Sequence, residues 1–186
     1  MSVQIAKRWF TVAQFNRMGE AGILTEDDRV ELIAGEIIEI SPIGKRHAAC
    51  VDRLVELFSE RLQRRAIIRV QSPIVLDDYS EPQPDIALLK RREDFYESAL
   101  PAPEDVLLVV EVSDTTLEYD RQVKVPLYAR AGIMEVWVVN LMDEQVEIYT
   151  NPTGGAYQSR RQLARRESFN SQAALNLALS VDDILG

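Results

Sequence analysis

Two apolar stretches of the chain each carry one carboxylate, and these acids are the residues best suited to chemistry. Asp85 begins the apolar run of residues 85–89, and Glu111 interrupts the valine-rich run of residues 106–113. A further valine would be less costly there than a buried charge, so the glutamate needs a reason. The helical stretch that follows carries Lys124. Two acids and a nearby lysine can bind a divalent cation and promote attack on a phosphodiester.

Other kinds of chemistry are poorly supported by the composition. The chain has one histidine, His47, and one cysteine, Cys50, whereas a zinc site of soft ligands needs about four. A serine or cysteine nucleophile activated by histidine would have to use His47. Neither common type of glycine-rich phosphate loop occurs.

The length and composition suit an ordinary globular protein. At 186 residues the chain predicts one domain spanning residues 1–186, and its 46% apolar and 27% charged content is typical of such domains. Its longest apolar stretches fall far below the roughly 18 residues of a membrane span, which predicts no membrane partner. The N-terminal residues lack the apolar stretch of a signal peptide. We therefore expect a cytoplasmic protein.

Charge is distributed unevenly along the chain. The net charge of −9 argues against nonspecific binding to nucleic acid. Residues 45–69 are nevertheless locally basic, and residues 160–166 hold a second cluster of arginines. Either cluster could meet a phosphate backbone, although a run of charges is more often a solvated face.

The elements that must position these residues follow from hydrophobic periodicity. Thr11 can cap a helix through about Met18, and residues 29–40 predict a hairpin that turns at Ala34-Gly35 with Glu31 opposite Ile38. The next expected elements, in chain order, are a helix over 47–64, a strand over 66–76 bent at Pro73, the Asp85 strand, the Glu111 strand, a helix over 118–131, strands over 134–141 and 145–150, a loop over 151–155 and a short helix capped by Ser180.

The order of these elements predicts an α/β fold with a mixed sheet flanked by helices. The crossover from Glu111 to Val138 through a helix requires parallel pairing, whereas the hairpins are antiparallel. Pro126 lies inside the crossover helix, so we expect a kink near Gln122. Side chains alternate along a strand, so Glu111 shares one face with Val109. With Asp85 at the start of the neighbouring strand, both acids lie at one end of the sheet.

The chain resembles the restriction-endonuclease-like superfamily, which is known by its PD-(D/E)XK pattern. The similarity is greatest to a branch of this superfamily in which the lysine lies on the following helix. It covers roughly residues 10 to 150. The segments that carry it are Pro84-Asp85, Glu111-Val112-Ser113, Asp120 with Lys124, the Gly132–Trp137 stretch, the Glu31–Glu36 hairpin and His47.

One position departs from the superfamily pattern, which has lysine where this chain has Ser113. The resemblance implies that Lys124 takes over this role, and that Asp85 and Glu111 bind Mg²⁺ or Mn²⁺. It further implies three catalytic residues, Asp85, Glu111 and Lys124. Possible auxiliary residues are Glu31, His47 and Asp120.

Each of these residues also has a simpler explanation. Asp120 and Lys124 have the spacing of a surface ion pair, worth about 0.2–0.5 kcal/mol on a helix. Asp85 could cap a turn after a proline, Glu111 could pair with an arginine, and Glu31 could form an ion pair within its hairpin. A half-buried structural role suits the histidine.

The resemblance implies a Mg²⁺-dependent endonuclease that hydrolyses phosphodiester bonds in nucleic acid, with DNA as the expected partner and a homodimer as the expected assembly. The alternative is a catalytically inactive fold relative that acts as a dimeric binding or assembly module, because a fold alone does not imply a function. A hydrolase of another phosphorylated substrate is a third hypothesis.

Overall fold

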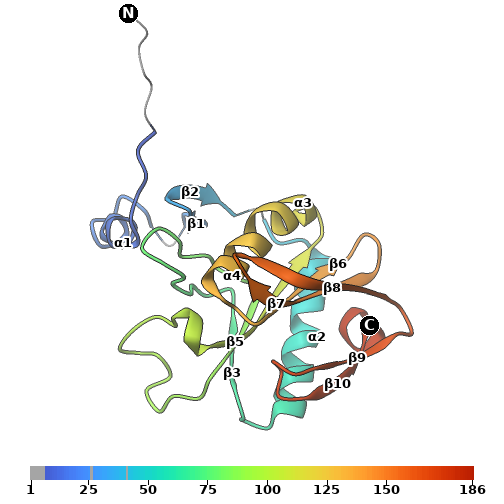
Figure 1. Cartoon of the computed structure of the whole chain (residues 1–186). Helices are drawn as coiled ribbons and strands as arrows, with labels where there is room; N and C mark the ends of the chain where they lie inside the picture. The colour runs from blue at the N-terminus through green and yellow to red at the C-terminus, as the bar shows by residue number, and fades with distance from the viewer. Residues whose placement is uncertain (1–6, 26, 41) are drawn as a thin grey trace, which may run out of the picture.

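A mixed six-stranded sheet forms the centre of the protein (Figure 1). The structure is a computed structural model that describes residues 7–25, 27–40 and 42–186; residues 1–6, part of the stretch searched for a signal peptide, lie outside it. The strand order is β3-β4-β5-β6-β7-β8. These strands are β3 Ile67–Val70, β4 Ile86–Leu89, β5 Val106–Ser113, β6 Glu135–Asn140, β7 Gln145–Thr153 and β8 Ala156–Ala164.

The pairing within this sheet agrees with the mixed sheet predicted from the sequence. Strands β5 and β6 are parallel, with Glu111 opposite Val138, and the other neighbouring pairs are antiparallel. The chain passes from β5 to β6 through helical segments, because parallel neighbours need a crossover.

Helices cover both faces of the sheet (Figure 1). Helix α2 (Lys45–Leu62) and the C-terminal helix α5 (Val181–Leu185) pack with one face, where the strands contribute Val110, Val112 and Trp137. The opposite face contributes Val109 and Val138 to a second core together with Tyr128 of the crossover. As predicted from strand alternation, Glu111 lies on the same face as Val109, beneath the crossover segments.

The N-terminal elements are as predicted. Helix α1 (Val12–Glu20) begins after Thr11, whose hydroxyl accepts the backbone N–H of Gln14 in a capping box. Strands β1 (Val30–Ile33) and β2 (Glu36–Glu39) form the hairpin, with Glu31 opposite Ile38. Both turn residues have positive φ, as a tight two-residue hairpin turn requires.

Backbone hydrogen bonds join this hairpin to the segment that leads into β4. Two such hydrogen bonds link Leu32 and Glu81, with N to O distances of 3.3 and 2.7 Å. The backbone N–H of Gln83 then donates to the Glu31 carboxylate at 3.0 Å. The hairpin therefore places the Glu31 carboxylate next to the segment that precedes Asp85.

The crossover departs from the single kinked helix that we expected over 118–131. It consists of α3 (Leu117–Tyr119), the π-helical turn η2 (Asp120–Lys124) and α4 (Val125–Ala131). Pro126 lies in the first turn of α4, where its missing N–H is tolerated. The N–H of Val125 donates to the carbonyl of Asp120, five residues earlier. The proline therefore follows a widened turn and not a simple bend.

Two further boundaries differ from the predictions. Strand β3 ends at Val70, because Gln71 has φ of 46° and interrupts the extended chain before Pro73. Strand β7 continues to Thr153, through part of the loop expected over 151–155. Elements that the sequence did not reveal are the edge strand β8, the hairpin of β9 (Ser168–Ser171) with β10 (Leu177–Ser180), and the 3₁₀ turn η1 (Pro103–Asp105).

The terminal helix α5 begins after Ser180, as expected from its capping pattern. Across the described ranges of the chain, no helix is long and apolar enough to cross a membrane.

Replacing Gly35 with alanine should destabilise the protein by about 1–3 kcal/mol. Gly35 has φ of 83°, and an added Cβ would lie 2.9 Å from the Cβ of Trp9. Gly19→Ala is the matched control, because Gly19 lies in α1 and an added Cβ there would have no heavy atom within 4 Å apart from the neighbouring backbone of its own helix. Urea denaturation measures both; equal stability of Gly35→Ala and the wild type would contradict the strained turn.

Candidate active site

A cavity of about 460 Å³ lies at the end of the sheet where β5 stops. The hairpin, the first turn of α2, the end of β5 and the start of the crossover all contribute to its walls. It brings together every site residue predicted from the sequence: Glu31, His47, Asp85, Glu111, Asp120 and Lys124.

Asp85 lies immediately before β4, and several contacts fix its carboxylate. Its Oδ2 atom accepts the backbone N–H of Val112 at 2.8 Å, and its Oδ1 atom lies 3.0 Å from Nε2 of His47. The side chain of Gln71 donates a further hydrogen bond of 3.3 Å to Oδ1. Asp85 therefore contacts β5, its neighbour in the sheet, and does not merely cap a turn.

Glu111 is buried, with 2% of its surface exposed. Its Oε1 atom accepts the hydroxyl of Tyr128 at 2.6 Å and lies 3.2 Å from Nζ of Lys124. Burial raises the pKa of Glu111 to about 8, although the Lys124 ammonium opposes this shift. The pairing with an arginine that we considered for Glu111 is therefore not found; its cation is a lysine.

Lys124 reaches two acids from different parts of the chain. Its Nζ atom lies 3.2 Å from Oε2 of Glu31 and 3.2 Å from Oε1 of Glu111, and its residue is only 6% exposed. Burial lowers the pKa of Lys124, but the carboxylates of Glu111 and Glu31 outweigh this effect and raise it. The lysine is therefore charged at neutral pH, and it is not part of a surface ion pair with Asp120.

Asp120 is also buried, but it contacts hydroxyl groups. Its Oδ2 atom accepts Oγ of Ser113 at 2.7 Å and the hydroxyl of Thr116 at 2.8 Å. Burial raises the pKa of Asp120, while the Ser113 hydroxyl opposes the shift. Ser113, which stands where the superfamily pattern has lysine, thus holds the start of η2 against the end of β5.

The turn η2 is fixed to the sheet by a second ion cluster that the sequence analysis did not identify. Arg121 of η2 donates from Nε to Glu147 of β7 at 3.0 Å, and Arg160 of β8 lies 3.0 Å from the same carboxylate. Glu147 is fully buried and also accepts the hydroxyl of Tyr149. An acid within the apolar strand β7 was the available signal for this cluster.

Two residues that line the cavity each have a buried polar atom without a hydrogen-bond partner in the described part of the chain. Among the described residues, the buried side-chain nitrogen and oxygen atoms without a hydrogen-bond partner are Nδ1 of His47 and the hydroxyl oxygen of Tyr119. Both residues line the cavity, and Tyr119 was not predicted from the sequence. The hydrogen bond with Asp85 raises the pKa of His47. Unsatisfied buried groups are costly, but both atoms are themselves buried and so do not present a donor or acceptor to the cavity.

The carboxylates fit a hard divalent cation better than a zinc ion. Within the described chain, no group of three or more histidine, cysteine, aspartate or glutamate side chains is arranged to hold a metal ion. Mg²⁺ is usually bound through one or two carboxylates, with water and phosphate oxygens as the remaining ligands. Ile86 pairs with Val110 in antiparallel register, which places Asp85 level with Glu111 on the adjoining strand. The donor set therefore suits Mg²⁺ or Mn²⁺ with an open coordination sphere.

Glu111→Gln should change how stability depends on pH. The folded-state pKa of Glu111 is raised above its unfolded value, so its contribution to stability is full below about pH 4.5 and declines as pH rises toward 8. The neutral amide removes this decline. Relative to the wild type, the variant should therefore gain more than about 1 kcal/mol between pH 5 and pH 8. Urea denaturation in EDTA measures the difference; a difference independent of pH would contradict the raised pKa.

Comparisons with known proteins agree with this fold. The sequence model of the Uma2 family, described as "putative restriction endonuclease", matches residues 12–182. The crystal structure of "a putative nuclease belonging to DUF820" from Anabaena variabilis is similar over 95% of this chain and 97% of that chain, with a TM-score of 0.73 and 17% sequence identity. No protein of curated function matches the sequence. The predicted restriction-endonuclease-like fold is confirmed, and the chain belongs to the Uma2 family.

Proposed function

We propose that the protein is a metal-dependent endonuclease that hydrolyses phosphodiester bonds in DNA. The observation that carries this proposal is the Lys124 ammonium, which is buried between Glu31 and Glu111 in the wall of the cavity that Asp85 also lines. A charged lysine in a cavity lined by acids suits phosphoryl transfer, because the ammonium can stabilise the negative charge that develops on the phosphate in the transition state.

In this proposal Asp85 and Glu111 would hold a Mg²⁺ or Mn²⁺ ion. When bound, the ion lowers the pKa of a coordinated water and neutralises charge on the scissile phosphate. Val112, His47 and Gln71 orient the Asp85 carboxylate through the contacts described above. A fixed carboxylate presents its oxygens without reorganisation when the substrate binds.

Lys124 contributes electrostatic stabilisation and orients the attacking water. Its raised pKa disfavours a role as a general base, because the carboxylates around it stabilise the protonated amine. Glu31 contacts the same ammonium from the hairpin and so helps to fix its position. Glu31 therefore acts as a positioning residue.

His47 and Tyr119 complete the wall toward the substrate. Their unpartnered atoms are themselves buried, so these residues shape this wall, and His47 orients Asp85 through its Nε2 atom. Asp120 is turned to the hydroxyls of Ser113 and Thr116, so we propose that it positions η2 and does not bind the ion.

The two acids should be required for binding of metal ions. Isothermal calorimetry with Mn²⁺ should detect binding to the wild type, and Asp85→Asn and Glu111→Gln should each weaken it by at least about tenfold. Glu104→Gln is the control, because Glu104 is an exposed acid in η1, before the other end of β5. Absence of Mn²⁺ binding by the wild type would favour the alternative of an inactive binding or assembly module.

Lys124→Met should abolish cleavage while Mn²⁺ binding is largely retained. Loss of one group that stabilises the transition state lowers kcat by about 10²–10³. Cleavage of plasmid and single-stranded DNA measures the rate, and calorimetry shows that the metal site persists. Lys90→Met, which removes an exposed lysine just after β4, should cleave at the wild-type rate. Unchanged cleavage by Lys124→Met would contradict the proposed role.

A further inference from the structure

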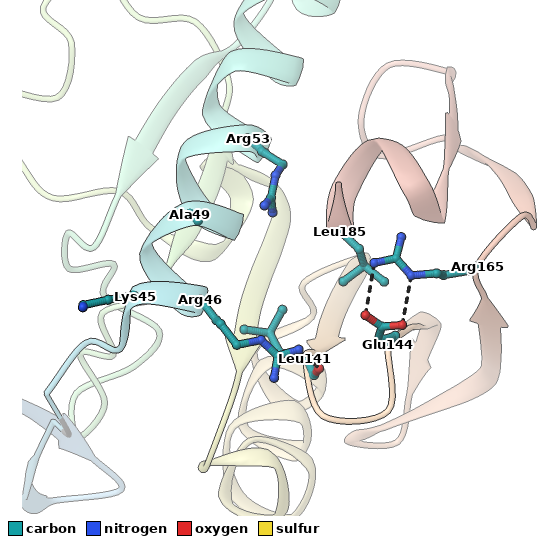
Figure 2. A pocket seen from close by; sticks show the side chains of 8 residues that line it. All are labelled: Lys45, Arg46, Ala49, Arg53, Leu141, Glu144, Arg165 and Leu185. Atoms are coloured by element: carbon teal, nitrogen blue, oxygen red, sulfur yellow. Dashed lines mark hydrogen bonds and ion pairs between the residues drawn. The ribbon is translucent and has the colours of Figure 1, made fainter.

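A second cavity, which we call the basic hollow, lies on the other side of the first turn of α2. It has a volume of about 220 Å³, and its cations are Lys45, Arg46, Arg53 and Arg165. Figure 2 shows the first three on α2, where Arg46 and Arg53 point toward Glu144 and Lys45 points away from it. Arg165 reaches in from the turn that follows β8. Among its described lining residues, Glu144 has the one acidic side chain, and Gly186 lies against the guanidinium of Arg53.

The positive charge of the basic hollow is only partly neutralised. Arg165 lies 3.0 Å from Glu144 and 3.0 Å from Asp182, so its charge is balanced within the protein (Figure 2). Lys45, Arg46 and Arg53 form no ion pair with any residue that the structure describes. Arg46 donates to the carbonyl of Leu141 at 2.7 Å, which orders its guanidinium but leaves the charge in place.

Such a concentration of cations is unfavourable in the free protein. Lys45 and Arg46 lie in the first turn of α2, which contains no acid, and the partial positive charge of a helix start repels them. The chain as a whole carries a net charge of −9, so this local excess contrasts with the remaining surface. Binding of an anion would relieve the repulsion.

The basic hollow adjoins the candidate active site. Gly44 and His47 line the active-site cavity, whereas Lys45 and Arg46 line the hollow. An α-helix is about 10–12 Å across, and phosphates of one strand follow at about 3.4 Å along a duplex axis. If the scissile phosphate of a nucleic acid lies in the active site, the hollow would therefore lie beside a phosphate that is on the order of three nucleotides from the scissile one.

We infer that the basic hollow binds backbone phosphates of the nucleic-acid strand that flanks the cleavage point, which rests on the proposed nuclease function. Its remaining walls are aliphatic, with Ala49, Leu141 and Leu185, so the described walls offer no aromatic ring on which a base could stack. Cations without base contacts recognise phosphates irrespective of sequence. The hollow therefore supplies affinity and register, and it does not select a sequence.

The test measures binding without cleavage. Fluorescence anisotropy in EDTA follows the binding of a labelled 20-base-pair DNA duplex, and of the RNA duplex of the same sequence, at several salt concentrations. The variant Arg53→Gln removes a cation that points into the hollow (Figure 2), and it spares Arg46 and Arg165, which hold the local structure. Affinity should fall by about threefold or more, and the slope of log K against log salt should decrease by about one.

A control of equal charge separates location from net charge. Arg130→Gln removes one exposed arginine that lies outside the hollow and outside both basic clusters, and its affinity and salt slope should equal those of the wild type. Equal losses in both variants would show that only net charge matters and would overturn the inference. Failure of the wild type to bind either duplex would also overturn it.

The outcome is distinguishable from that of the proposed function. Binding in EDTA requires no metal ion, whereas the proposed hydrolysis is tested by Mn²⁺ calorimetry and by Lys124→Met. A protein that binds nucleic acid through the basic hollow but neither binds Mn²⁺ nor cleaves would retain the inference and lose the proposed activity.

Discussion

The contact on which the site depends is the buried ammonium of Lys124 between the carboxylates of Glu31 and Glu111. Removing charges from water is costly, and only close pairing with further hydrogen bonds compensates for it. Here each acidic group has such a hydrogen bond: Tyr128 donates to Glu111, and the backbone of Gln83 donates to Glu31. The hairpin, β5 and the crossover are therefore joined at one point by a single side chain.

The backbone around Lys124 is shaped to this contact. The π-helical turn η2 widens the crossover where Asp120 and Lys124 both face inward, and such turns are frequent at functional sites. The turn is held at its start by Ser113 through Asp120, and near its centre by Arg121 on Glu147. A lysine on the crossover can thus occupy the place beside Glu111 that the superfamily pattern fills from the strand itself.

In the proposed function, the active-site cavity performs the hydrolysis and the basic hollow binds the nucleic-acid backbone. Acids and a balanced lysine line the cavity of the candidate active site, whereas cations without ion-pair partners among the described residues line the basic hollow. Since carboxylates repel a phosphate backbone, an acidic protein that acts on nucleic acid needs such a separate attachment point. The first turn of α2 contributes to both cavities and fixes their separation.

Much of this protein was determined by the sequence alone, because local periodicity decides which faces are apolar. The hairpin register that places Glu31 opposite Ile38, the face of Glu111 and the parallel pairing of β5 with β6 all followed from alternation and connection rules. The site residues were predicted from a related rule, because a charged residue within an apolar strand is costly without a partner. In the structure these residues line one cavity.

Only the tertiary structure decided which partner each charge has. Glu31 and Lys124 are far apart in sequence, and no periodic pattern relates them. Only the folded chain therefore shows that Lys124 forms a buried pair with two glutamates and not a surface pair with Asp120. The same holds for Arg121 with Glu147, and for the edge strand β8, whose exposed polar residues follow no clear pattern. These contacts join segments remote in sequence, and their free energy depends on burial that no local pattern encodes.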